Sequence, residues 1–146
     1  MWFLFVALFL IALAFALYYG RICYVSRLAE KELPLLEKDP AAFAARWEAR
    51  LKKAKLPPVK SMSLFLVASG LAHAGEPKRA LERMRFVKAS DRGVARLDPR
   101  AAAALYDHLL RETGNDAEAD AVYMTAGPLI EAGSKSPYVP QKKKTA

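Results

Sequence analysis

The chain has 146 residues, a net charge of +8, 53% hydrophobic residues, one cysteine and two histidines. Because Cys23 is the only cysteine, an intrachain disulfide and a thiolate metal cluster built from this chain alone are excluded. His73 and His108 lie in no metal-binding spacing, so we expect neither a metal nor another cofactor. Once about 20 residues are assigned to a membrane helix, roughly 125 remain, which suits one soluble domain.

The first 20 residues predict a transmembrane helix. They include no charged side chain, and a helix of this length spans about 30 Å, the thickness of a bilayer's hydrocarbon core. Tyr18 and Tyr19 close the run and Arg21 follows, in the order typical of a membrane interface. Ala14-Phe15-Ala16 is a small-residue triplet of the kind found at signal cleavage sites. A signal peptide has a basic start and a shorter apolar run, so we favour an uncleaved anchor.

The basic residues beside the anchor predict its orientation. No Lys or Arg precedes the apolar run, whereas Arg21, Arg27 and Lys31 follow it. Cytoplasmic flanks of membrane helices are rich in Lys and Arg. We therefore expect a single-pass protein of the cell (inner) membrane, with its N-terminus outside and its C-terminal domain in the cytoplasm.

The positive charge is concentrated in two parts of the chain. Residues 21–60 hold ten Lys/Arg against five Asp/Glu, residues 61–128 hold nine of each, and residues 129–146 hold four against one. A nucleic-acid-binding domain carries its basic surplus on the folded body. This distribution instead favours contact between the juxtamembrane residues and anionic lipid headgroups, and we expect no nucleic-acid partner.

Residues 21–60 predict a juxtamembrane basic helical region. The helical pattern continues from the anchor to Leu33, where Pro34 is expected to break or kink it. Asp39-Pro40 then supplies a helix cap and a first helical residue. The next helix carries an apolar stripe composed of Phe43, Trp47, Leu51 and Ala54. This stripe either lies in the membrane interface or packs in the domain, and we favour packing because the stripe is narrow.

Residues 61–128 predict two helix hairpins in tandem. In the first hairpin, Gly75 supplies a left-handed turn residue and Pro77 opens the second helix. In the second hairpin, Asp98-Pro99 begins a helix, Gly114 ends it, and Gly127-Pro128 stops the helix that follows. Two similar hairpins suggest structural repeats.

These hairpins resemble the tetratricopeptide repeat family. The matching residues of the first hairpin are Leu64, Val67, Ala68, Leu71, Gly75, Ala80 and Met84, and those of the second are Leu110, Gly114, Ala119, Tyr123 and Ala126. Asp107 departs from the pattern, because the family has a small residue there. Gly75 and Gly114 lie 39 residues apart, against about 34 in the family, so an inserted loop around residues 90–97 is expected. The resemblance implies an all-α, TPR-like domain that binds proteins.

The order of anchor and helical repeats is similar to that of the bacterial lipopolysaccharide assembly protein B family. The border Tyr19-Gly20-Arg21 resembles the point at which that family's anchor ends. The family also has a C-terminal four-cysteine metal domain, for which this sequence, with one cysteine, has no counterpart. The resemblance therefore concerns the layout alone.

Residues 129–146 are expected to form a flexible basic tail. The segment contains Pro137, Pro140 and the run Lys142-Lys143-Lys144, and it has no apolar period. Such a composition favours an extended or disordered chain. The lysine run is either a solvated end or a binding element, and we favour the solvated end.

The sequence contains no catalytic motif, so we expect neither an enzyme nor a small-molecule substrate. The predicted function is a membrane-anchored adaptor or scaffold that binds a protein partner, with lipid contact through residues 1–20. The alternative is a small accessory subunit of a larger membrane complex, in which the anchor packs against other transmembrane helices. The candidate partner-binding side chains lie on the first helices of the two hairpins: Ser69, Ala72, His73, Tyr106 and Arg111.

Overall fold

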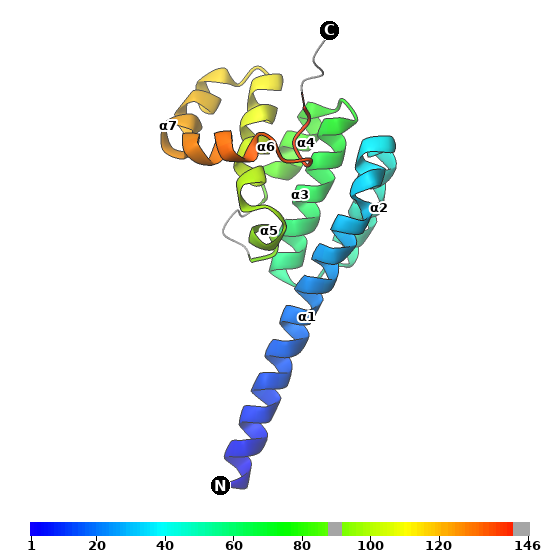
Figure 1. Ribbon diagram of the computed structural model, residues 1–146, viewed down its shortest axis with the longest axis vertical. Coiled ribbons are helices and arrows are strands. Elements are labelled where there is room, and N and C mark those ends of the chain that lie inside the picture. The colour runs from blue at the N-terminus through cyan, green and yellow to red at the C-terminus, as the bar shows by residue number, and fades with distance from the viewer. Residues whose placement is uncertain (88–91, 142–146) are drawn as a thin grey trace.

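The computed structural model describes residues 1–87 and 92–141, and within them every regular element is a helix. The expected all-α class is therefore confirmed. In chain order the helices are α1 (Trp2–Lys38), α2 (Pro40–Lys53), α3 (Pro57–His73), α4 (Pro77–Met84), α5 (Arg92–Leu97), α6 (Pro99–Glu112) and α7 (Asp116–Gly133). Figure 1 shows the first half of α1 projecting from a bundle formed by the other helices and the second half of α1.

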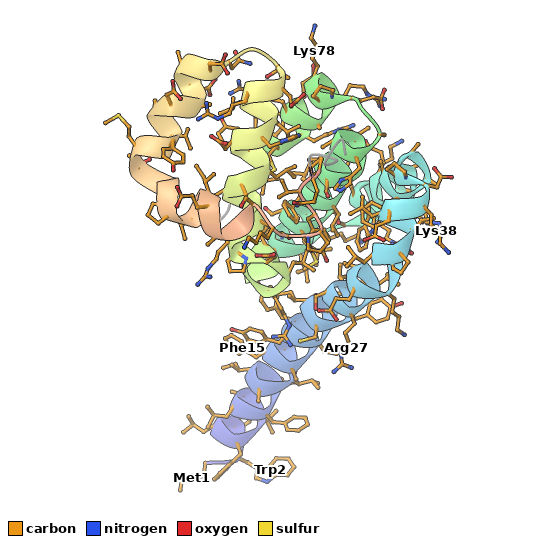
Figure 2. All side chains as sticks on the ribbon, turned by 45° about the horizontal axis from the view of Figure 1, so that its top comes forward. Met1, Trp2, Phe15, Arg27, Lys38 and Lys78 are labelled. Atoms are coloured by element: carbon orange, nitrogen blue, oxygen red, sulfur yellow. The ribbon has the colours of Figure 1, made fainter. Side chains whose placement is uncertain are left out.

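Helix α1 has two halves with different surroundings. Residues 2–17 are exposed throughout, and the most apolar 18-residue window of α1 has a mean hydropathy of 2.4 with none of it buried. Figure 2 shows Trp2 and Phe15 on this free part of the helix. Farther along, Ile22, Val25 and Ala29 are buried in the domain core. A helix long and apolar enough to cross a membrane therefore continues without a break into the domain.

Pro34 does not break α1, so the first of the two effects expected from sequence, a break or a kink, is wrong. The helix continues to Lys38, and Leu36, beyond the proline, is buried. A proline inside a helix removes one hydrogen bond and crowds the preceding turn. Burial of Leu36 in the core favours the helical path and offsets this cost.

Helix α2 packs in the domain, which decides between the two interpretations of its apolar stripe. Asp39 caps α2 by accepting a hydrogen bond from the backbone N–H of Ala42 at 3.1 Å, as its position predicted. Phe43 and Trp47 are both 0% exposed, and α2 contacts α1 and α3. The approach to α3 is close, since a Cβ on Gly70 would lie 2.9 Å from the Cβ of Ala44.

Helix α3 is the centre of the bundle. It contacts α1, α2, α4, α5 and α6, and its buried side chains occur all around the helix. Examples on different faces are Met62, Phe65, Leu66 and Ala68. A helix that is apolar on every side is stable in water only when other elements enclose it. Helix α3 therefore offers little free surface.

The turns of the two expected helix pairs have the predicted backbone. Gly75, between α3 and α4, has φ +80°, and Gly114, between α6 and α7, has φ +81°. These are left-handed conformations that glycine adopts without a steric penalty. Asp98 caps α6 by accepting hydrogen bonds from the backbone N–H groups of Arg100 and Ala101. The loop expected around residues 90–97 is in part a helix, α5, which packs against α3 and α1.

Helix α7 continues past Gly127-Pro128, so the expected stop at that pair is wrong. It ends at Gly133, and both Ile130 and Gly133 are buried. At Gly133 the helix meets the start of α6 so closely that a Cβ would lie 2.1 Å from the carbonyl oxygen of Arg100. Packing against α6 therefore outweighs the local helix-breaking signal.

The segment after α7 is also packed, which corrects the expected flexible tail over residues 129–141. Ser136, Tyr138 and Val139 are buried, and the rings of Tyr138 and Phe65 lie 5.5 Å apart in an edge-to-face arrangement. One hydrophobic core thus extends from Ile22 to Val139 and includes parts of residues 21–60, 61–128 and 129–141. The lysine run at 142–144 lies outside the described residues.

Candidate functional site

Part of the predicted partner-binding surface is covered by the segment of this chain that follows α7. Ser69 is fully buried, and its hydroxyl donates a hydrogen bond to the backbone carbonyl of Tyr138. Ser69, predicted to bind a partner, is therefore not accessible to one, because residues 134–141 cross this part of α3. Ala72 and His73 are half-buried near the end of α3, and His73 Nδ1 lies 2.8 Å from the carbonyl oxygen of Ser69.

The other two predicted residues connect α6 to α7. The hydroxyl of Tyr106 donates a hydrogen bond to Glu118 Oε1 at 3.0 Å. Arg85, after α4, binds the same carboxylate at 3.1 and 3.2 Å. These hydrogen bonds, that of Arg85 first, hold the pKa of Glu118 below its usual range. Burial, followed by the Glu118 contact, raises the pKa of Tyr106.

Arg111 also has carboxylate partners. It binds Asp107 at 3.2 Å and Asp120 at 3.1 Å, and the Asp107 contact is the main cause of its raised pKa. Asp107, which departs from the tetratricopeptide pattern, thus takes part in an ion pair at the α6 surface. Tyr106 and Arg111 thus join α6 to α7 through these contacts, so their side chains are already engaged within the domain.

A more open apolar surface lies on the outer face of α7. Ala117, Ala121, Met124 and Pro128 recur at helical spacing, and all are exposed. Met124 is 89% exposed and Leu129, beside this face, is 51% exposed. The opposite side of α7 packs on α6 through residues that include Ala119 and Ile130. We call the five exposed residues the α7 outer face.

Sequence reasoning missed the α7 outer face. An apolar residue every three or four positions on the side opposite Ala119, Ala126 and Ile130 was the available signal. It was obscured because Gly127-Pro128 was interpreted as the end of the helix. The resemblance to tetratricopeptide repeats also led us to place the candidate contact residues on the first helix of each pair, whereas α7 is the second helix of its pair.

A pocket of about 310 Å³ lies where α1 enters the domain, and we call it the junction pocket. Its polar lining comes from three helices and consists of Arg21, Tyr24, Trp47, Arg50, Lys53 and Ser63. These residues are spread over positions 21–63, so no local motif in the sequence predicts that they meet. The nearest signal is Trp47 and Arg50 at an i, i+3 spacing on α2.

An ion pair fixes one wall of the junction pocket. Arg50 of α2 donates to Glu32 of α1 at 2.6 and 2.7 Å, and its guanidinium carbon lies 4.5 Å from the centre of the Trp47 ring. The hydrogen bond from Arg50 is the main reason why the pKa of Glu32 is lowered. Arg46 also contacts Glu32, at 3.5 Å. These contacts join α2 to α1.

The other polar features are a free thiol and a pocket beside α6. Residues 1–87 and 92–141 contain no cluster of three or more His, Cys, Asp or Glu side chains that could hold a metal ion. Cys23 is a half-buried free thiol on α1, near the point where this helix enters the domain. His108 and Glu112 line a shallow pocket between α6 and residues 134–141, together with Asp107 and Arg111.

The fold defines an all-helical protein in which one long apolar N-terminal helix continues into a small helical domain. Comparison with protein-family models, with curated proteins and with solved structures finds no match to this chain.

Proposed function

We propose that this protein is a membrane-anchored adaptor whose cytoplasmic helical domain binds a protein partner. The observation that carries the proposal is the α7 outer face. It is an apolar surface at the end of the helical array, on the same chain as a helix able to cross a membrane. The anchor confines the partner to the membrane surface, and the α7 outer face supplies the contact.

Continuity of α1 supports an anchor that stays attached. A leader cleaved near Ala16 would be cut inside a helix whose later residues, from Ile22 onward, belong to the domain core. Because α1 enters the core without a flexible linker, the anchor also determines how the domain stands on the membrane. The exposed Arg21, Arg27 and Lys31 favour a cytoplasmic domain.

The position of α7 supports a protein partner. The last helix of a repeat array normally has a polar outer side that keeps the protein soluble. Here that side has Met124 at its centre, with Ala121 and Pro128 one helical turn away and the charged Asp120 beside them. Methionine side chains are flexible and polarisable, and they are frequent at protein-binding surfaces. Burial of this face by a partner would stabilise the complex through the hydrophobic effect.

The test compares partners bound by the full chain and by a surface variant. The full chain is purified from membranes in mild detergent, and copurifying proteins are identified. Met124→Glu should remove a specific partner, because a carboxylate would be buried in the interface. Ala45→Glu, at an exposed position of α2, is the matched control and should retain the partner. The proposal is wrong if the same proteins copurify with all three chains.

A second candidate is a small accessory subunit of a larger membrane complex. Ala12, Ala16 and Gly20 recur every four residues on the exposed part of α1, an arrangement that lets transmembrane helices approach closely. Ala14 adds a further small side chain. Replacing residues 2–17 by an unrelated apolar helix discriminates the two functions. An adaptor keeps its partner after the exchange, whereas an accessory subunit loses assembly.

A further inference from the structure

The junction pocket combines buried polar atoms with surplus positive charge. Trp47 and Ser63 both line it, and both are 0% exposed. Among the described residues, Trp47 Nε1 and Ser63 Oγ are the buried side-chain polar atoms without a hydrogen-bond partner. Buried polar groups in folded proteins are nearly always hydrogen-bonded, so these two atoms point to a ligand that accepts hydrogen bonds.

The charge around these two atoms favours an anion. Arg21 and Lys53 line the same pocket and are exposed, and within the described part of the chain neither forms an ion pair. Arg50 is already paired with Glu32. In the part of the chain that the structure describes, one pocket is therefore lined by two cations without an ion pair, of which Arg21 also lies 5.8 Å from the centre of the Tyr24 ring, and by two residues with unpartnered neutral donors. An indole N–H donates only, and a serine hydroxyl can donate to an anionic oxygen.

The level of the pocket on α1 suggests the source of the anion. Arg21 lies 19 residues after Trp2, which corresponds to about 28 Å along a helix, close to the thickness of a hydrocarbon core. Tyr18 and Tyr19 precede it, where interfacial aromatic residues are expected. If α1 spans the bilayer, the pocket opens at the level of the lipid phosphates.

We propose that the junction pocket binds a phosphate group, supplied by the headgroup of an anionic phospholipid, through Arg21, Lys53, Trp47 Nε1 and Ser63 Oγ. This inference rests on the proposed insertion of α1 in the membrane. It goes beyond general attraction between a basic surface and a membrane, because two of the four donors are neutral and buried. A bound headgroup would hold α1, α2 and α3 together at the membrane surface and so fix the orientation of the domain.

Trp47 supplies a direct probe of the pocket. The chain has two tryptophans, Trp2 and Trp47, so Trp2→Phe leaves the pocket residue as the only one. The full Trp2→Phe chain is placed in nanodiscs of phosphatidylcholine containing increasing fractions of phosphatidylglycerol. The emission of Trp47 should change and saturate as the anionic lipid fraction rises. In a separate arm, inorganic phosphate is added to phosphatidylcholine discs.

Variants of the Trp2→Phe chain separate a specific site from diffuse attraction. Lys53→Gln and Ser63→Ala should each raise the half-saturating phosphatidylglycerol fraction about fivefold, since each removes one contact to the phosphate. Lys52→Gln carries the same charge change on the neighbouring residue, which does not line the pocket, and should have a much smaller effect. Equal effects of Lys52→Gln and Lys53→Gln, or no effect of Ser63→Ala, would overturn the site.

The experiment distinguishes binding of a lipid phosphate, binding of inorganic phosphate and failure of α1 to insert in the membrane. Saturation by inorganic phosphate that depends on Lys53 and Ser63 supports the phosphate site but overturns the lipid as its ligand. No response to either source overturns the proposal. If the chain fails to enter nanodiscs of any composition, the membrane insertion of α1 is itself wrong. Recovery of the chain in phosphatidylcholine discs without a response to phosphatidylglycerol overturns the lipid site and leaves the anchor intact.

Discussion

The hydroxyl of Ser69 donates a hydrogen bond to the backbone carbonyl of Tyr138, 69 positions later in the chain. Through this contact and the packing of Tyr138 on Phe65, residues 134–141 become part of the α3 surface. The segment covers Ser69, one of the residues predicted to contact a protein partner. Its removal should therefore affect the stability of the whole domain.

Replacing Tyr138 with alanine should destabilise the folded chain by about 3 kcal/mol or more, because a buried aromatic ring would be removed from the core. Thermal unfolding of the full chain in detergent, followed by circular dichroism, measures the change. Pro137→Ala, at the exposed neighbouring residue, is the control and should have little effect. Equal melting temperatures for the two variants would show that the segment contributes no core packing.

Alkaline pH should weaken the fold through the same residue. Burial raises the pKa of Tyr138 from 10.0 to about 12. The unfolded chain therefore loses this proton at a lower pH than the folded chain does. The stabilisation is complete below pH 10 and is lost as the pH rises towards 12. Tyr138→Phe retains the ring and should flatten the fall in melting temperature over this range. An unchanged slope would refute the link to Tyr138.

A charge placed between α3 and α4 should disrupt their contact. Ala80 is 0% exposed, so Ala80→Arg should cost more than about 2 kcal/mol of unfolding free energy. Chemical denaturation of the full chain in detergent provides the measurement. Ala45→Arg makes the same exchange at an exposed position of α2 and should be tolerated. Similar unfolding curves for wild type and Ala80→Arg would contradict the packing of this pair.

The Glu32–Arg50 ion pair should make stability sensitive to acid. The hydrogen bond from Arg50 holds the pKa of Glu32 below its usual 4.5. The stabilisation is therefore present above this pH and is lost as the pH falls through the lowered pKa. Glu32→Gln should cost about 1 kcal/mol at neutral pH, since Arg50 is partly exposed. Glu76→Gln, in an exposed pair with Arg79, should cost less. A larger loss of unfolding free energy in Glu76→Gln than in Glu32→Gln would contradict this prediction.

The orientation of the anchor is tested by a reporter fused after Ala146. An enzyme that is active only outside the cytoplasm should be silent there, because the Lys/Arg bias predicts a cytoplasmic C-terminal domain. A reporter active only inside the cytoplasm, fused at the same position, is the control. Activity of the external reporter at this position would require the opposite topology.

Short-range signals in the sequence determined the class of the fold and several helix ends. The apolar run of residues 1–20, the caps at Asp39 and Asp98, and the turns at Gly75 and Gly114 each depend on a few neighbouring residues. Hydrogen bonding and backbone conformation act over the same short range, so these features were predictable. The same applies to the burial of Phe43 and Trp47, which follows from their helical spacing.

Only the tertiary structure decided which surfaces remain open. The burial of Ser69, the path of residues 134–141 and the helix that continues beyond Pro128 all depend on partners distant in the chain. Each contradicts a local signal, because the free energy gained by packing exceeds a local preference of about 1–3 kcal/mol. The α7 outer face and the junction pocket likewise exist only once α6, or α1, α2 and α3, have come together. A site formed by long-range packing has no signature at any single position in the sequence.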